Sequence, residues 1–316
     1  MIGVIGAGAF GTALAVALGR EGREVVLWAR DAAQAEAMQH GRSNMARLPG
    51  IALPETVTVT ADRAALSGAD AFLLSLPMQA LGGFLDAFGA ELRSPWLVAC
   101  CKGVDLRTLK GPAELLRRAR PDLEAAVLTG PSFAADIARG LPTALTLAGG
   151  DEALQRLLST PSLRLYRSDD VTGAELGGAL KNVMAIAAGV VIGAGLGDSA
   201  RAALMTRGYA EMLRLALALG ARAETLAGLS GLGDLVLTCT SAQSRNFRFG
   251  QALGSGQGFD PAVTVEGAAT AKAVSNMAQK LSIDMPITAM VAALIDREIS
   301  LPQAIQALLS RPLKQE

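Results

Sequence analysis

The sequence predicts an α/β protein in which a doubly wound, mostly parallel sheet is followed by an all-α domain. Two observations support this fold class. Up to about residue 170, short apolar β-type runs alternate with helical stretches, which is the pattern of βαβ units. Beyond that point the strand signal fades, and Ala, Leu, Met and Gly dominate segments with helical spacing. We place the boundary near residue 180, which gives two domains, 1–180 and 181–316.

The elements of the sheet are predicted from apolar runs bounded by turn residues. Strands are expected over Ile2–Ile5, Glu24–Trp28, Val57–Val59, Ala71–Ser75, Trp96–Cys101, Ala126–Leu128 and Ala144–Leu147. Helical spacing predicts long helices over Ala202–Leu219 and Thr264–Leu281. The longest uncharged run, Asn182–Gly197, is shorter than the roughly 18 apolar residues of a membrane span. We therefore expect a buried helix there and no membrane span.

The composition excludes several classes of protein. Apolar residues make up 51% and charged residues 18% of the 316 residues, which excludes a disordered chain. Basic and acidic residues balance at 29 each, so no net charge attracts nucleic acid or an anionic membrane. Cys100, Cys101 and Cys239 form no CxxC pair, which argues against disulfides and zinc. Because no signal peptide precedes the first strand either, we expect a cytoplasmic protein.

A glycine motif follows the first predicted strand. Gly6, Gly8 and Gly11 form a GxGxxG pattern that also opens a helix, and this context distinguishes a dinucleotide-binding fingerprint from a chance match. The first glycine permits the tight turn, the second lets the backbone approach a pyrophosphate, and the third lets the helix pack on the strand. The sequence therefore predicts a Rossmann-type domain that binds a nicotinamide dinucleotide.

The end of the second predicted strand bears on the cofactor. An acidic residue at this strand tip binds a ribose 2′-hydroxyl, whereas an arginine accommodates a 2′-phosphate. Asp31 would suit NAD, and Arg30, which is nearer the tip, would suit NADP. We favour NADP with Arg30 as its contact, and NAD is the alternative.

Few residues can supply the proton that carbonyl reduction requires. The single histidine, His40, lies in a polar loop. A tyrosine-lysine pair needs Lys four residues after Tyr, but Asp170 follows Tyr166 and Leu213 follows Tyr209 at that distance. Elimination therefore leaves lysine.

Two lysines lie in unusual places. Lys102 follows the strand-like WLVACC, at the edge where parallel sheets bind ligands. Lys181 lies in the apolar helical stretch ELGGALKNVMAIAAG, where loss of hydration would lower its pKa. Either could instead be a core-edge lysine whose ammonium reaches water.

A phosphate-binding cluster is predicted at Ser244, Arg245 and Asn246. Arginine offers a forked pair of donors to phosphate, and the neighbouring hydroxyl and amide add neutral donors. The alternative is that Ser244 simply caps an exposed helix. The stretch GPSFA, residues 130–134, ends another predicted strand and is either a ligand loop or a plain turn.

Over nearly its whole length the sequence resembles the bacterial-type NAD(P)-dependent glycerol-3-phosphate dehydrogenases. The shared motifs are GAGAFGTALA from residue 6, WAR from 28, NMARLPG from 44, CKGVD from 101, GPSFAADIARGLPTA from 130, ELGGALKNVMAIAAG from 175, GLGDLVLTCTSAQSRN from 231 and VEGAATA from 265. The resemblance implies interconversion of sn-glycerol 3-phosphate and dihydroxyacetone phosphate for phospholipid synthesis. It also implies a homodimer and a helical domain like that of 6-phosphogluconate dehydrogenase.

The resemblance also implies residue roles. Lys181 is expected to be the proton donor and acceptor, aided by Lys102 and Asp234. The substrate site would comprise Lys102, Gly130, Ser132, Asp234, Ser244, Arg245 and Asn246. The cofactor site would comprise Gly6, Gly8, Ala9, Phe10, Gly11, Arg30, Lys102, Ala134, Arg245, Thr264 and Glu266. The chain departs from the family pattern at Arg47, Met78, Asp136 and Phe247.

Two other functions are weighed against this one. A β-hydroxyacid dehydrogenase shares the two-domain plan and a catalytic lysine, but it has Asn four residues after that lysine. Here Ala185 occupies that position, and Asn182 is adjacent to Lys181 instead. The second alternative is a catalytically silent sensor that only binds NADP.

Overall fold

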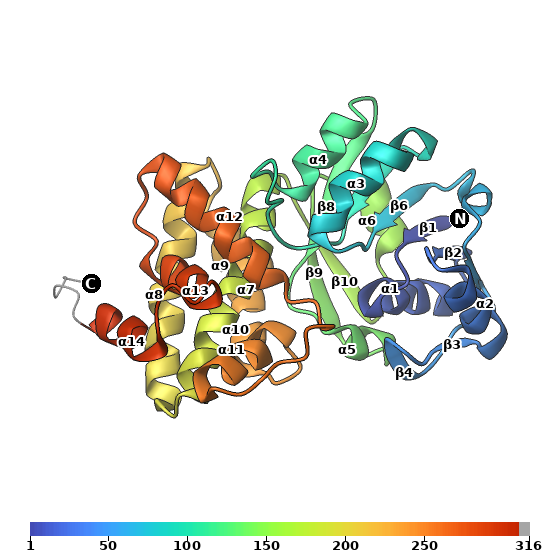
Figure 1. Cartoon of the computed structure of the whole chain (residues 1–316). Coiled ribbons are helices and arrows are strands. Elements are labelled where there is room, and N and C mark those ends of the chain that lie inside the picture. The colour runs from blue at the N-terminus through green and yellow to red at the C-terminus, as the bar shows by residue number, and fades with distance from the viewer. Residues whose placement is uncertain (310–316) are drawn as a thin grey trace.

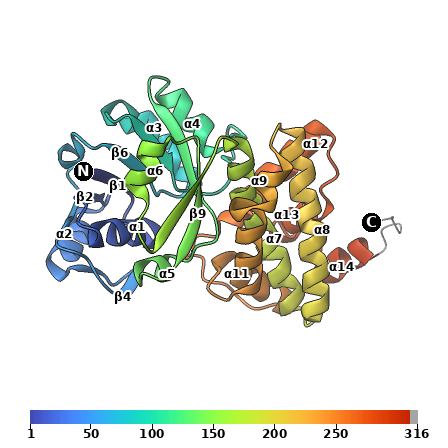
Figure 2. The same ribbon diagram turned by 180° about the vertical axis from the view of Figure 1, so that it is seen from behind.

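The computed structural model describes residues 1–309, so the last residues of the predicted second domain, 310–316, lie outside the described part. A sheet covered by helices occupies residues 1–168, and a bundle of helices occupies residues 171–309 (Figures 1 and 2). We call these regions the sheet part and the helical part. The two lie side by side, and the carboxyl ends of the first strands face the helical part (Figure 1).

The main sheet has eight strands in the order β10-β9-β8-β7-β6-β1-β2-β5. Its strands are β1 Ile2–Ile5, β2 Val25–Trp28, β5 Val57–Thr60, β6 Ala71–Leu74, β7 Trp96–Ala99, β8 Glu124–Thr129, β9 Thr143–Ala148 and β10 Leu163–Ser168. All neighbouring strands are parallel except β8 and β9, which pair antiparallel. The doubly wound, mostly parallel sheet is therefore confirmed. Because the chain crosses from β5 to β6 on the far side of β1, the switch point of the topology lies between β1 and β6.

Two features of the sheet part were not predicted. Strand β10 alternates buried Leu163 and Leu165 with exposed Arg164 and Tyr166, as expected of an edge strand that buries one side. A small hairpin, β3 Ser43–Asn44 and β4 Leu48–Ala52, follows α2 (Ala32–Gly41). Both segments are too short or too polar to give a clear apolar run.

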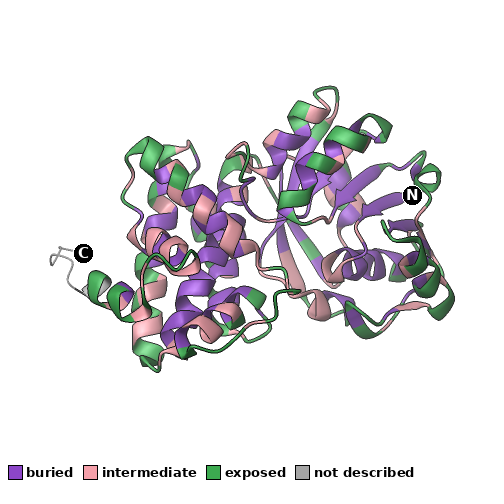
Figure 3. Cartoon of the chain, viewed as in Figure 1, coloured by how far each residue is buried: buried purple, intermediate pink, exposed green. Residues whose placement is uncertain are grey.

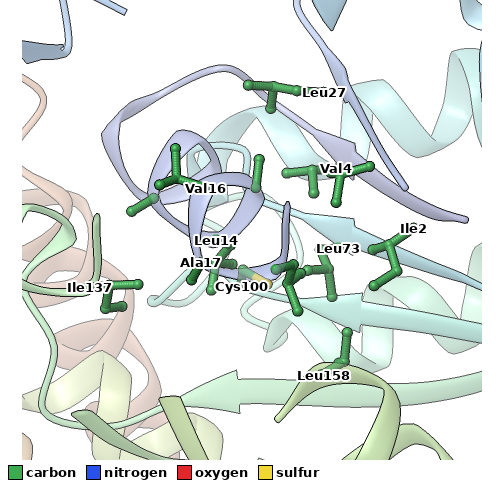
Figure 4. Packing of buried hydrophobic residues seen from close by; sticks show 14 of the residues in the cluster. Ile2, Val4, Leu14, Val16, Ala17, Leu27, Leu73, Cys100, Ile137 and Leu158 are labelled. Carbon is green, nitrogen blue, oxygen red and sulfur yellow. The ribbon is translucent and has the colours of Figure 1, made fainter. Parts of the chain in front are cut away.

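Alternate residues of each strand fill two separate cores. Val4 and Leu73 pack into the core under α1 (Ala9–Arg20), and Figure 4 shows this packing. Their neighbours Ile5 and Leu74 pack into the core on the opposite face. The first face is covered by α1, α2, α5 (Ala134–Ala138) and α6 (Glu152–Leu158), and the second by α3 (Met78–Phe88) and α4 (Pro112–Ala119). Burial on both faces explains why the strands read as continuous apolar runs.

In the helical part, the other helices pack around a central helix, α7 Val171–Gly193. By length and composition α7 could cross a membrane, but 89% of its most apolar window is buried inside the protein, and Figure 3 shows it buried along most of its length. The prediction of a buried helix is confirmed from Asn182 to Gly193, where α7 ends; Gly197 begins the next helix instead. The other helices are α8 Gly197–Ala218, α9 Ala223–Ala227, α10 Asp234–Thr240, α11 Arg245–Ser255, α12 Glu266–Leu281, α13 Pro286–Ile295 and α14 Leu301–Leu309, with a π-helical turn at Leu229–Gly233.

Glycines let neighbouring segments approach α7 at backbone distance. A Cβ added to Gly189 would lie 2.1 Å from the carbonyl oxygen of Phe247, and one added to Gly193 would lie 2.2 Å from that of Gln251. Both carbonyls belong to α11. Towards the sheet part, a Cβ on Gly178 would lie 2.5 Å from Oγ1 of Thr129, at the end of β8. Residue 180, where the sequence places the boundary, falls inside this helix.

Candidate functional site

The centre of the site is Lys181, in the middle of α7. Its side chain is only 9% exposed. Nζ donates hydrogen bonds to Oδ1 of Asp234 at 2.9 Å and to Oγ1 of Thr238 at 2.7 Å. Asp234 and Thr238 lie four residues apart on α10 and therefore share one face of that helix. The lysine that the sequence placed in an apolar helix is thus buried, with its charge paired.

Lys102 approaches the same carboxylate from the sheet part. It follows β7, and its Nζ donates to Oδ2 of Asp234 at 2.5 Å and to the carbonyl oxygen of Gly130 at 3.1 Å. Gly130 follows β8, the neighbouring strand. The carboxyl ends of two strands and the middle of α7 therefore meet at Asp234, which is fully buried.

Burial and charge set the protonation of this group of residues. Burial lowers the pKa of Lys181 to about 8, and the nearby charge of Lys102 adds to that effect, while Asp234 opposes it. Burial alone would raise the pKa of Asp234, but the two ammonium groups outweigh it and the pKa is lowered. Asp234 thus stays ionised at neutral pH, and Lys181 can gain or lose a proton near neutral pH.

The predicted phosphate cluster lies at the start of α11. Oγ of Ser244 accepts a hydrogen bond from the N–H of Phe247, so Ser244 is the N-cap of the helix. Arg245, the first helical residue, is exposed. Asn246 is buried, with Nδ2 donating to Oδ1 of Asn182 and Oδ1 accepting from the N–H of Gly267, both at 2.9 Å. The capping alternative is thus present. Among residues 1–309 the Arg245 guanidinium and the second amide hydrogen of Asn246 make no hydrogen bond, so both are available for a ligand.

The glycine fingerprint has the geometry of a phosphate loop. Gly6 has φ +109°, a conformation that favours glycine, and a Cβ on Gly11 would lie 2.1 Å from the carbonyl oxygen of Gly6. A Cβ on Gly8 would have no neighbour within 4 Å among the described residues. Ala9 and Phe10 open α1, whose N-terminus is not capped by a side chain within residues 1–309. Open space beside free main-chain N–H groups fits a dinucleotide pyrophosphate.

The hairpin supports this loop. The side chain of Asn44 is buried, and its Nδ2 donates to the carbonyl oxygen of Ala7 at 3.0 Å and to Oγ1 of Thr12 at 2.8 Å. The motif NMARLPG therefore braces the phosphate loop through its first residue. The motif alone does not indicate this role, because the contact joins Asn44 to residues more than 30 positions earlier.

The two residues near the end of β2, Arg30 and Asp31, differ in whether their side chains make hydrogen bonds within the protein. Asp31 caps α2, because its Oδ1 accepts from the N–H of Gln34 at 3.0 Å. Arg30 is exposed and makes no hydrogen bond or ion pair with any residue from 1 to 309. Its guanidinium is therefore available at the strand tip.

The remaining predicted residues lie on the segments that follow β8 and that precede or open α12. Oγ of Ser132 donates to the carbonyl oxygen of Gly130 at 3.2 Å, and Ala134 is the first residue of α5. Thr264 is exposed, two residues before α12. Burial raises the pKa of Glu266, and the charges of Arg245, Lys102 and Lys181 oppose that rise, which places Glu266 near the site.

Two hydroxyls of the site were not singled out from the sequence. Thr238 accepts from Lys181, and its position four residues after Asp234 was an available signal. Oγ1 of Thr129 is buried without a hydrogen-bond partner among the residues described. Because Thr129 faces Gly178 and precedes Gly130, this hydroxyl adjoins the lysine cluster.

The four departures from the family pattern have different surroundings. Phe247 and Met78 are buried and belong to the hydrophobic cores of the helical part and the sheet part. Arg47 is exposed in the turn between β3 and β4, and Asp136 on α5 pairs at 2.6 Å with Arg139, the residue after that helix. None of the four removes a group from the lysine cluster.

The chain matches two family models that together span most of its length. Residues 1–155 match the N-terminus of NAD-dependent glycerol-3-phosphate dehydrogenase, and residues 170–306 match its C-terminus. The chain is 68% identical to glycerol-3-phosphate dehydrogenase [NAD(P)+] of Cereibacter sphaeroides, with all of both chains covered. It is 60% identical to the protein of that name from Paracoccus denitrificans, covering 100% of this chain and 99% of the other.

Solved structures agree with this relationship. The crystal structure of glycerol-3-phosphate dehydrogenase from Coxiella burnetii superposes with a TM-score of 0.93 at 38% identity, covering 98% of each chain. A ketopantoate reductase from Ralstonia eutropha shares the fold alone, with a TM-score of 0.62 at 20% identity and coverage of 94% and 98%. On its full-length identity to these relatives, and with both family models matched in order, the chain belongs to the NAD-dependent glycerol-3-phosphate dehydrogenase family.

Proposed function

We propose that the chain catalyses the reversible, NAD(P)-dependent interconversion of sn-glycerol 3-phosphate and dihydroxyacetone phosphate. The observation that carries the proposal is the convergence of Lys102 and Lys181, from two parts of the molecule, on the buried carboxylate of Asp234. An ammonium group with a pKa of about 8 therefore lies beside the carboxyl ends of β7 and β8, which supports Lys181 as the proton donor. Family membership supports the same reaction.

The residues of the site divide the work. When bound, the nicotinamide supplies the hydride that reduces C2 of dihydroxyacetone phosphate. Lys181, as an ammonium, donates its proton to the oxygen on C2 and recovers it in the reverse direction. Asp234 holds Lys181 and Lys102 in place, and Lys102 binds substrate and cofactor. Gly130 and Ser132 line the substrate side of the site.

The substrate phosphate is assigned to the start of α11. Arg245 provides the forked guanidinium donors, and Asn246 provides its remaining amide hydrogen. The hydrogen bonds to Asn182 and Gly267 fix the orientation of that amide. Ser244 contributes by holding the first turn of the helix, where free N–H groups favour an anion.

The cofactor is assigned to the edge of the sheet part. The phosphate loop, which contains Gly6, Gly8, Ala9, Phe10 and Gly11, would hold the pyrophosphate. Arg30 would bind the 2′-phosphate of NADP, which is our preferred cofactor, and NAD is the alternative. Ala134, Thr264, Glu266 and Arg245 would complete the contacts.

Several broader properties accompany this function. We propose that residues 1–180 form the cofactor-binding domain and that residues 181–316 form the domain that binds substrate and carries the catalytic lysine. Lys102 belongs to the first domain and also contributes to the substrate site. We further propose a homodimer in the cytoplasm that makes glycerol 3-phosphate for phospholipids and binds no nucleic acid. Light scattering of the purified chain tests the dimer directly.

One assay tests the reaction. Purified protein is mixed with NADPH or NADH, and the nicotinamide absorbance is followed after dihydroxyacetone phosphate is added. We expect absorbance to fall only when protein and substrate are both present. Turnover of a different keto acid instead would favour a β-hydroxyacid dehydrogenase, and cofactor binding without any turnover would favour a silent sensor.

A further inference from the structure

A second acidic group links the two parts away from the lysine cluster. Glu175 lies on α7, and its Oε1 accepts a hydrogen bond from the main-chain N–H of Ala113 at 2.5 Å. Ala113 is the second residue of α4, which packs on the sheet. The helix that carries Lys181 is thus hydrogen-bonded to the sheet part through this carboxylate.

The start of α4 is shaped to receive that carboxylate. Its N-cap is Gly111, which has no side chain to cap the helix, and its first residue is Pro112, which has no N–H. A Cβ on Gly111 would lie 2.8 Å from Oε2 and 2.9 Å from Oε1 of Glu175. The carboxylate therefore occupies space that glycine leaves open, at the positive end of the helix dipole.

Glu175 reaches neither lysine directly among the described residues. It precedes Lys181 by less than two turns of the same helix. Burial is the main reason that the pKa of the Cys101 thiol is raised, and the charges of Glu266 and Glu175 add to it. Cys101 is the residue before Lys102. Within residues 1–309, no hydrogen bond joins Glu175 to either lysine or to Asp234.

The second fixed point of α7 on the sheet part is steric. Gly178 rests against Thr129 at the end of β8. Val171, at the start of α7, also packs on the apolar core of the sheet part. Apolar and steric contacts of this kind set the spacing between α7 and the sheet but leave the helix some freedom to pivot. A hydrogen bond three residues away, to a different element, removes that freedom. Along α7, Glu175 precedes Gly178 by three residues and Lys181 follows it by three. A pivot about Gly178 would therefore move the ammonium group of Lys181.

We propose that Glu175 is a positioning residue, which ties α7 to the start of α4 and so holds Lys181 in register with Lys102 and the bound substrate. The inference rests on the proposed function, because it takes Lys181 as the proton donor. Glu175 acts through the helix and touches no reacting atom.

The chain offers a matched control in Glu211. This carboxylate, on α8, accepts from the N–H of Ile287 at 2.7 Å and from that of Thr288 at 3.2 Å. It meets the start of α13, which also begins with proline and, within the described chain, has no capping side chain of its own. Burial raises the pKa of both carboxyls, Glu175 and Glu211, to about 7. Glu211 differs in joining two helices of the helical part.

The experiment compares Glu175→Ala, Glu175→Gln and Glu211→Ala in the full-length protein. Melting temperature, kcat, and KM for each substrate are measured. We expect Glu175→Ala to lower kcat about tenfold, because small misplacements of a catalytic group are costly, with KM for the nicotinamide nearly unchanged. Glu175→Gln keeps an acceptor for the N–H of Ala113 and should restore most of kcat. Glu211→Ala should lower the melting temperature as much while kcat stays near that of the unaltered protein.

The pH dependence of kcat separates positioning from general stability. A pivot of α7 on the sheet part moves Lys181 away from Lys102, whose charge lowers the pKa of Lys181. That effect then weakens, so the pH midpoint of kcat moves up. We expect this shift in Glu175→Ala and not in Glu211→Ala. Gly111→Ala, which fills the space of the carboxylate, should reproduce the kcat loss and the shift if Glu175→Ala fails to fold.

Two results would overturn the inference. The first is that kcat stays unchanged in both Glu175→Ala and Gly111→Ala. The second is that Glu175→Ala and Glu211→Ala lose kcat equally and show no pH shift. The variant Lys181→Met distinguishes failure of this inference from failure of the proposed function. If Lys181→Met is inactive while Glu175→Ala is fully active, only the positioning role fails. If Lys181→Met is active, the proposed function fails.

Discussion

The sheet part and the helical part present their functional groups in opposite ways. At the edge of the sheet, the phosphate loop offers main-chain N–H groups beside open space, and Arg30 is exposed. In the helical part, Lys181 and Asp234 are buried charges held by one another. The comparison teaches that cofactor binding in the sheet part depends on the shape of the backbone. Proton transfer at Lys181 depends instead on a balance of charges removed from water.

The largest effect should come from breaking that charge balance. Asp234→Asn keeps the shape of the side chain but leaves two ammonium groups without a counter-charge. We expect the free energy of unfolding at neutral pH to fall by about 3–5 kcal/mol in urea denaturation. Glu152→Gln is the control, because Glu152 pairs with Arg156 on an exposed face and should change stability by less than about 1 kcal/mol. Equal losses in the two variants would contradict the comparison.

Removing the proton donor should affect the reaction and leave cofactor binding unchanged. Lys181→Met preserves the bulk of the side chain in its apolar surroundings, and we expect kcat to fall by about 10² or more. Cofactor affinity, measured by nicotinamide fluorescence, should not change, because the phosphate loop lies in the other part. Lys110→Met, at an exposed position, is the matched control. Near-normal turnover in Lys181→Met would rule out its assigned role.

The pH dependence sharpens the comparison in both reaction directions. Reduction needs the Lys181 ammonium, whose pKa is about 8, so kcat should fall about tenfold per pH unit well above that value. Oxidation needs the neutral amine and should lose rate below the same pH. Because burial lowers this pKa from 10.5, the unfolded chain binds more protons between the two values, and stability contributed by this group should rise with pH there. A midpoint that stays fixed in Asp234→Asn would argue that Lys181 is not the titrating group.

The smallest effect is expected at the exposed edge of the sheet part. Arg30→Ala should lower kcat/KM for NADPH by about tenfold, because one hydrogen-bonded charge pair to phosphate is lost, and should leave NADH unaffected. Steady-state kinetics with both cofactors measure this. Arg118→Ala, at the exposed end of α4, serves as the control. Equal losses with NADH and NADPH would refute the preference for NADP.

Most strands of the sheet part were predictable because burial on both faces makes each of them a continuous apolar run. Runs such as Ile2–Ile5 bury on both faces and therefore stand out. Strand β10 was missed because only Leu163 and Leu165 carry its buried side. In the helical part, an uncharged run was enough to predict that α7 is buried.

The site was less accessible to sequence reasoning. Elimination selected Lys102 and Lys181, and the family resemblance added Asp234, and the structure brings all three together. Thr238 and Glu175 were not selected, because their contacts depend on which faces of α10, α7 and α4 meet. Such contacts between helices join residues that are far apart in the chain, so no local sequence pattern predicts them.

The close packing along α7 has a consequence for heat adaptation. Replacing a helical glycine by alanine commonly stabilises a protein, by up to about 1 kcal/mol. At Gly189 and Gly193 the added methyl group would overlap carbonyl oxygens of α11, so the same replacement should loosen the bundle. A relative that lives at high temperature would have to gain its stability elsewhere, with the central helix left as it is.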